Sequence, residues 1–157
     1  MKKIEFINKS KIIEKLKDYG IEKLPYLLIK SGKEKIRIFS GHLSKEEITK
    51  LRRNVYIETL GLYFAKFDND QLRLNLDSLH LLKNKIKNKI INLNKTQTKQ
   101  YFEGKDVEAT KEQLKIAKEK SYYILKHNED ILGMSKIINN RIRNYLPKER
   151  RIKTPTK

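Results

Sequence analysis

Four arginines lie close together near the end of this sequence, at positions 141, 143, 150 and 151. They are half of the eight arginines in a chain that carries most of its positive charge on lysine. A guanidinium group presents a planar fork of donors that fits phosphate and stacks on bases, whereas an ammonium group is a compact point charge. Asparagines and Tyr145 lie among these arginines, opposed only by Glu149. The segment predicts a nucleic-acid-binding surface; the alternative is a basic, solvated face without a ligand.

The net charge of the chain is +18, from 37 lysines and arginines against 19 aspartates and glutamates. A surplus of this size favours a polyanion as the partner. Residues 1–80 have a net charge of +6, whereas residues 81–157 have a net charge of +12. Six lysines and no acid lie between Lys83 and Gln100. The polyanion-binding surface is therefore expected mainly in the C-terminal half.

Exposed aromatic rings are a second feature of RNA-binding surfaces, because bases stack on them. Tyr122 and Tyr123 are expected in one strand, where neighbouring side chains face opposite ways. Tyr101 and Tyr145 are flanked by polar and basic residues. They are the better candidates for stacking.

The residue types needed for most catalysis are missing or scattered. The chain has no cysteine, which excludes disulfides, thiol nucleophiles and cysteine-ligated zinc. Its three histidines, at 42, 80 and 127, have no metal-ligand spacing. Asp68 and Asp70 are expected to form a hairpin turn rather than a catalytic pair. We therefore predict no enzyme activity, no cofactor and no metal site.

The sequence also has no membrane signal. No apolar run approaches the roughly 18 residues that a bilayer-spanning helix needs. The N-terminus lacks the apolar core of a signal peptide. These features predict a cytoplasmic protein without a membrane partner.

Hydrophobic spacing and turn residues indicate a mixed architecture of helices and strands. Ser10 and Ser44 are expected to cap helices, and Thr110 with Gln113 forms a capping box. Helices are expected at 10–20, 44–51, 96–102 and 110–120, with a short one capped by Asp77 or Ser78. Strands are expected at 26–30, 35–39, 55–57, 60–67, 71–76, 89–93, 121–125 and 131–138.

The lysine-rich segment 83–89 marks the expected domain boundary. We predict an N-terminal α/β domain at 1–82, an RNA-binding domain at 83–152 and a disordered tail at 153–157. The overall fold class is α+β.

The C-terminal half resembles a PUA domain, a small RNA-binding pseudobarrel. Residues 102–107 are similar to the helix and glycine loop that open that fold, and residues 122–125 with 131–134 are similar to its late hairpin. Lys136 with residues 141–148 resembles the ending of the PUA-like domain attached to Sun-type RNA cytosine-5 methyltransferases. The resemblance implies a PUA-like β pseudobarrel without the methyltransferase core.

The N-terminal half has a second resemblance. Residues 60–67, 73–76 and 79–82 are similar to the junction between the pre-PUA and PUA domains of small ribosome-biogenesis proteins. Those proteins act in maturation of the large ribosomal subunit. The resemblance implies a pre-PUA-like α/β domain at the N-terminus.

Charge and resemblance together predict a non-enzymatic protein that binds structured ribosomal or transfer RNA, in ribosome biogenesis or rRNA processing. Pre-ribosomal proteins or an RNA-modifying enzyme are further expected partners. Two alternatives stay open: a specificity subunit for a methyltransferase supplied in trans, and a protein–protein scaffold. The predicted RNA-binding residues are Lys85, Lys87, Lys95, Lys99, Tyr101, Gly104, Lys105, Lys136, Asn140, Arg141, Arg143, Asn144, Tyr145, Lys148, Arg150 and Arg151.

Overall fold

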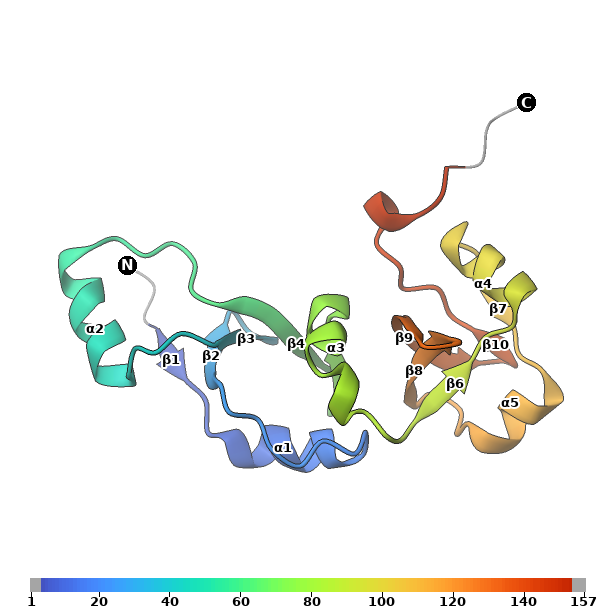
Figure 1. The fold of residues 1–157 in the computed structure, drawn as a ribbon, viewed down its shortest axis with the longest axis horizontal. Helices are drawn as coiled ribbons and strands as arrows, with labels where there is room; N and C mark the ends of the chain where they lie inside the picture. Colours follow the sequence, from blue (N-terminus) through green and yellow to red (C-terminus); the bar gives the residue numbers. More distant parts are fainter. Residues whose placement is uncertain (1–3, 154–157) are drawn as a thin grey trace. The chain divides into compact units, whose positions relative to one another are not determined.

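The computed structural model describes residues 4–153, which divide into two compact units (Figure 1). Unit 1 ends at Ile86 and unit 2 begins at Lys87. Each unit combines helices with a five-stranded sheet, so the predicted α+β class is confirmed. The expected disordered tail lies outside the described residues, apart from Lys153.

Unit 1 is built on an antiparallel sheet in the order β1-β2-β3-β4-β5. Its strands are β1 (Glu5–Phe6), β2 (Leu27–Ser31), β3 (Lys35–Phe39), β4 (Leu62–Asp68) and β5 (Gln71–Leu74). Its helices are α1 (Lys9–Lys17), α2 (Lys45–Asn54), α3 (Leu76–Leu81) and the short 3₁₀ helix η1 (Lys83–Lys85). Asn69 and Asp70 both have positive φ in the turn between β4 and β5, as a two-residue hairpin loop requires.

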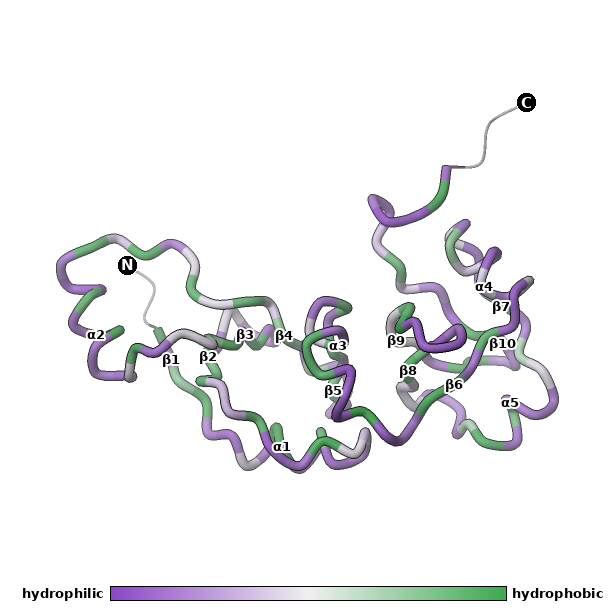
Figure 2. The backbone as a smooth tube through the Cα atoms, viewed as in Figure 1, coloured by the Kyte–Doolittle hydropathy of each residue, from purple (hydrophilic) through white to green (hydrophobic). Residues whose placement is uncertain are grey.

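One face of this sheet carries the core of unit 1. Ile36 and Ile38 of β3 are buried, as are Ile12 and Leu16 of α1. Figure 1 shows α1 running along one side of the sheet. Helix α2 is mostly hydrophilic (Figure 2), and Ile48 is its only buried residue. Its capping box forms as predicted, with Ser44 as the N-cap.

Unit 2 contains a curled half-barrel with the strand order β6-β8-β9-β10-β7. Its strands are β6 (Ile90–Asn92), β7 (Val107–Glu108), β8 (Tyr122–His127), β9 (Asp130–Ile138) and β10 (Arg141–Ile142). Its helices are α4 (Lys95–Phe102), α5 (Lys111–Ile116) and the 3₁₀ helix η2 (Lys148–Arg150). Strand β6 pairs in parallel with β8, and the other pairings are antiparallel.

A buried pair of glutamine amides holds the helices of unit 2 to its strands. The Nε2 of Gln97 donates to the Oε1 of Gln113, and the Nε2 of Gln113 donates back to the Oε1 of Gln97, both at 3.0 Å. The remaining donor of Gln97 reaches the Glu108 carbonyl at 2.9 Å, and that of Gln113 reaches the Asn92 carbonyl at 2.7 Å. Each amide oxygen also completes a capping box, so both side chains use their full hydrogen-bonding capacity.

Several predictions of local structure are wrong. Helix α1 is capped by Asn8 rather than Ser10, because the Asn8 side chain accepts from the Ser10 amide. Helix α3 is capped by Asn75 rather than Asp77 or Ser78, and the Ser78 hydroxyl instead donates to the Tyr63 carbonyl. Residues 55–57 form no strand. The two-residue strands β1, β7 and β10 were too short for a periodic pattern to indicate them.

We expect Gly133→Ala to destabilise unit 2 by roughly 2–3 kcal/mol, through overpacking and a strained backbone. Gly133 lies on β9 at φ +149°, and an added Cβ would lie 2.8 Å from the hydroxyl oxygen of buried Tyr101. Chemical denaturation checks the free energy of unfolding. Gly32→Ala is the control, because φ is +73° there but no atom lies within 4 Å of the new Cβ. If both changes lowered the free energy of unfolding equally, the contact with Tyr101 would not be the cause of the loss.

Candidate nucleic-acid interface

The loop between α4 and β7 is shaped by a glycine that ends the helix. Gly104 has φ +83°, its N–H donates to the Tyr101 carbonyl, and the Lys105 N–H donates to the Gln100 carbonyl. These two bonds form a Schellman motif, which places a left-handed residue, usually glycine, just beyond the helix. The motif turns the chain so that Lys105 is exposed directly after α4.

Asp106 ties this loop to the segment that follows β10. Its Oδ2 accepts from the Arg143 Nη1 at 2.6 Å, and its Oδ1 accepts from the Asn144 N–H at 2.8 Å. Arg141 Nη2 donates more weakly to the Asp106 carbonyl, at 3.4 Å. Two of the clustered arginines are therefore oriented by a single acidic residue.

Asn144 closes the same connection from the other side. Its Nδ2 donates to the carbonyls of Tyr101 and Lys105, at 2.7 and 2.9 Å, and its Oδ1 accepts from the Leu146 N–H. The Asn144 amide is thus occupied within the protein. The Asn144 side chain therefore positions the loop.

Arg151 packs across the glycine loop. Its Nε donates to the Leu146 carbonyl at 3.0 Å. Its side chain covers Gly104, where an added Cβ would lie 2.6 Å from the Arg151 Cδ. The absence of a side chain at position 104 is therefore what lets Arg151 reach this loop.

A shallow hollow of about 620 Å³ opens beside the loop. We call it the α4–β7 hollow, and it is lined by Gln100, Gly104, Lys105, Asp106, Glu108 and Arg141. A hydrogen bond from Lys105 lowers the pKa of the Glu103 carboxyl, which keeps that group ionised. The Lys105–Glu103 pair, at 2.7 Å, has an exposed ammonium group. The Glu103 side chain is only 12% exposed, so the ammonium group is the part of this pair that a ligand can reach.

The structure brings six of the predicted residues together around this loop and leaves the others apart. The six are Gly104, Lys105, Arg141, Arg143, Asn144 and Arg151. Lys99 lies on the last turn of α4, Lys95 starts that helix, and Lys85 and Lys87 precede β6. Asn140 is in the β9–β10 turn, and Lys148 and Arg150 are on η2. Tyr145 is half-buried, with its ring centroid 6.2 Å from that of Tyr122.

Two predicted contact residues are buried, and the predictions for them are wrong. Tyr101 is 1% exposed and packs in the core of unit 2, so its ring cannot stack on a base. Lys136 is 7% exposed, because it lies opposite Tyr122 in the β8–β9 pair and its ammonium sits 4.4 Å from that ring centroid. Polar sequence neighbours suggested exposure for Tyr101, and the resemblance to a PUA-like ending suggested a contact for Lys136, but the fold covers both side chains.

Two positioning residues were missed. Asp106 lies within the segment that resembles the opening of the fold, yet its carboxylate had no predicted role. Gln97 follows Asn94 at capping-box spacing, the same signal that identified the start of α5 at Thr110. That spacing could have located both glutamines, although not their contact with each other.

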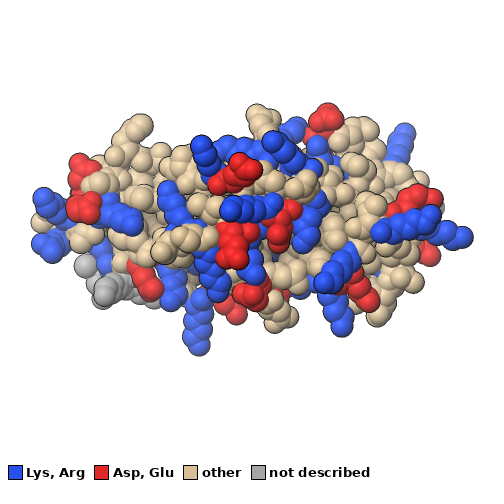
Figure 3. All heavy atoms as spheres, turned by 90° about the horizontal axis from the view of Figure 1, so that it is seen from below, with Lys and Arg blue, Asp and Glu red and all other residues tan. Residues whose placement is uncertain are grey.

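Basic side chains are not confined to one patch. In the view of Figure 3, lysines and arginines are spread along the chain with acidic side chains between them. Oriented groups such as those around Asp106 are therefore better evidence for a site than local charge alone.

A comparison with known families finds a match within unit 2. Residues 88–152 match the family described as the methyltransferase RsmF PUA domain. Unit 2 contains a PUA domain. The match confirms the predicted resemblance, and these 157 residues contain no methyltransferase core beside the PUA domain. A search of curated proteins found no match.

The PUA domain indicates RNA binding. Within residues 4–153, no group of acidic or histidine side chains is arranged to hold a metal ion. Across the same part of the chain, none of the helices is long and apolar enough to cross a bilayer.

Proposed function

We propose that this protein binds structured RNA through its PUA domain without modifying it, and that it acts in the maturation of ribosomal or transfer RNA in the cytoplasm. The observation that carries the proposal is the PUA match over residues 88–152, which includes the α4–β7 hollow and its oriented arginines. Lys105 and Arg141 supply positive charge at this hollow, and Lys99, on the last turn of α4, is close enough to Glu103 to help lower the pKa of its carboxyl. Phosphate contacts of this kind provide most of the affinity of such surfaces.

A specificity subunit for an RNA methyltransferase is the second candidate. It is favoured by the type of PUA domain, because the matching family takes its name from a methyltransferase. In that case the chain would deliver RNA to an enzyme supplied by a separate protein. The RNA contacts are the same in both candidates.

Affinity purification of the full chain with and without RNase separates the candidates. RNA binding predicts that crosslinked ribosomal or transfer RNA is recovered and that associated proteins are lost after RNase. A methyltransferase that stays bound after RNase would identify a subunit. Retention of unrelated proteins without any crosslinked RNA would contradict RNA binding and indicate a scaffold.

We expect the affinity for a stem-loop RNA to fall steeply with salt. If four to six basic groups contact phosphates, log K against log salt has a slope of about −3 to −5. Titrations with a labelled stem-loop at several salt concentrations measure this slope. A flat salt dependence would contradict binding through phosphates.

A further inference from the structure

The sheet of unit 1 has a second face, opposite α1, that carries a row of cations. Strand pairing places Lys35 of β3 opposite Lys66 of β4, and Lys66 opposite Arg73 of β5. Directly paired residues project from the same face of a sheet. On the α1 face, the corresponding row is apolar, with Ile36 opposite Ala65. We call Lys35, Lys66 and Arg73 the cation row.

The cation row places three positive charges side by side on neighbouring strands. Like charges directly opposite each other on neighbouring strands destabilise a sheet. Strands β2 to β5 contain a single acidic residue, Asp68, which is two positions after Lys66 on β4 and therefore lies on the same face. Lys35 is exposed, and Lys66 and Arg73 are half-buried. Three cations against one carboxylate leave this face with a surplus of positive charge, which an anion bound across the three strands would neutralise.

A tyrosine ring lies within the same group of cations. Tyr63 of β4 pairs with Arg37 of β3, and the Lys35 ammonium lies 5.6 Å from the Tyr63 ring centroid. Burial raises the pKa of the Tyr63 phenol, and the positive charge of Arg73 opposes that shift. The half-buried ring therefore stays neutral at physiological pH. Basic side chains around a partly exposed ring are the combination on which single-stranded nucleic acids bind.

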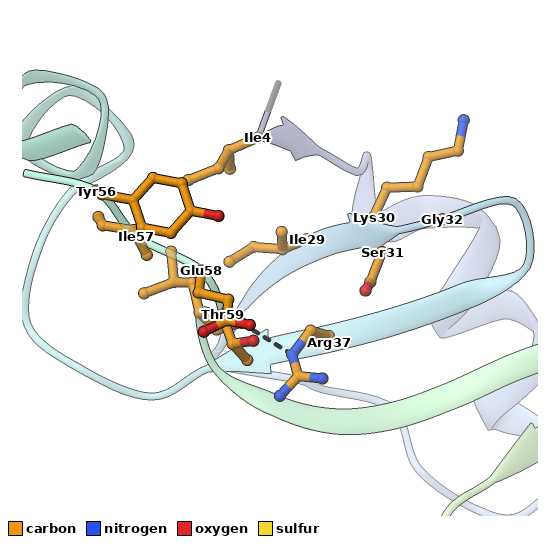
Figure 4. A pocket seen from close by; sticks show the side chains of 11 residues that line it. Ile4, Ile29, Lys30, Ser31, Gly32, Arg37, Tyr56, Ile57, Glu58 and Thr59 are labelled. Atoms are coloured by element: carbon orange, nitrogen blue, oxygen red, sulfur yellow. Dashed lines mark hydrogen bonds between the residues drawn. The ribbon is translucent and has the colours of Figure 1, made fainter. Parts of the chain in front are cut away.

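Arg37 connects this group to a hollow on the same face. Its Nε donates to the carbonyls of Leu60 and Gly61, at 3.1 and 3.0 Å, and its Nη2 donates to Gly61 at 2.5 Å. Figure 4 shows Arg37 and Ile29 facing the segment that carries Tyr56 and Thr59, around a hollow of about 690 Å³. The backbone bonds hold the guanidinium in place without neutralising its charge.

We propose that this face of unit 1 is a second RNA-binding surface, which holds a single-stranded segment with phosphates on the cation row and a base against Tyr63. The inference rests on the proposed function, because it assigns a further contact to a chain that binds RNA. The PUA domain takes the structured part of the RNA, and the unit 1 face takes a flanking single strand. An acidic protein segment could pair with the cation row, but it has no base to stack on the Tyr63 ring.

Two labelled probes test the full chain: oligouridine of about ten nucleotides, within the length range that single-strand-binding domains cover, and a stem-loop RNA. The triple change Lys35→Gln, Lys66→Gln and Arg73→Gln is expected to weaken oligouridine binding about tenfold or more, and to flatten its salt slope by about 2. Stem-loop binding should change by no more than about twofold. The unfolding temperature of the variant is measured beside the binding, to show that the variant is folded.

The matched control is Lys17→Gln, Lys23→Gln and Lys50→Gln, which removes three charges from exposed positions of unit 1. It should change oligouridine binding by about twofold at most. If both triple variants lost the same amount of oligouridine affinity, the effect would come from general surface charge, and the proposal would be wrong. Unchanged oligouridine binding in the first variant would do the same.

Tyr63 gives an independent test of stacking. Tyr63→Leu is expected to weaken oligouridine binding about fivefold or more with an unchanged salt slope, and Tyr63→Phe to restore it. An oligoglutamate that competes as well as oligouridine of the same length would show a site for acidic proteins, against the proposal. Failure of the wild-type chain to bind the stem-loop would contradict the proposed function itself, whatever the result with oligouridine.

Discussion

Lys99→Gln with Lys105→Gln and Arg141→Gln is expected to weaken stem-loop RNA binding roughly 10- to 100-fold at moderate salt. All three side chains are exposed, and they lie on the last turn of α4, on the glycine loop and on β10. Removing three phosphate contacts should also flatten the salt slope by about 2 to 3. Fluorescence titrations at several salt concentrations measure both quantities.

A control on the same unit separates position from charge. Lys111→Gln, Lys115→Gln and Lys118→Gln removes three exposed charges on and after α5, away from the α4–β7 hollow. This variant should bind the stem-loop RNA at most about threefold more weakly, because the long-range positive field is reduced. If its affinity fell as much as that of the variant changed at Lys99, Lys105 and Arg141, the α4–β7 hollow would not be the contact surface.

Gln97→Leu is expected to lower the free energy of unfolding of the PUA domain by roughly 2–4 kcal/mol. The change removes both bonds to Gln113 and leaves the Glu108 carbonyl and the Asn94 N–H without the Gln97 amide. Buried polar groups that lose their partner carry the full cost of desolvation. Calorimetry of the full chain, with amide hydrogen exchange at β6 and β7, measures the loss and assigns it to unit 2.

Gln100→Leu is the matched control, because Gln100 lies on the same helix but is exposed. It should change the free energy of unfolding by about 0.5 kcal/mol at most. If the two variants were equally stable, the amide pair would not hold the helices of unit 2 to its strands.

Local signals in the sequence predicted much of the fold. Capping boxes at Ser44 and Thr110 and the turn at Asn69 and Asp70 depend on residues a few positions apart, so the spacing alone identifies them. The PUA resemblance was recognised for the same reason, because its motifs are short and continuous. The charge surplus and the lack of cysteine likewise need no structure to be read.

The candidate site was predicted only in part. The concentration of arginine and the glycine loop were visible in the sequence, but their meeting at Asp106 was not. Arg143 and Asp106 are 37 positions apart. Their ion pair depends on how β7 and β10 pair, and a single sequence does not specify that register.

Burial was decided by tertiary structure alone. Gln100 precedes Tyr101 and Lys136 is itself charged, yet the closure of the half-barrel removes both side chains from solvent. The cation row arises in the same way, since Lys35, Lys66 and Arg73 become neighbours only when three strands align. Composition thus predicted a polyanion as the partner, and the resemblance of short motifs identified the type of domain. The pairing of distant strands decided which side chains are buried and which share an exposed face, because register sets the face from which each side chain projects.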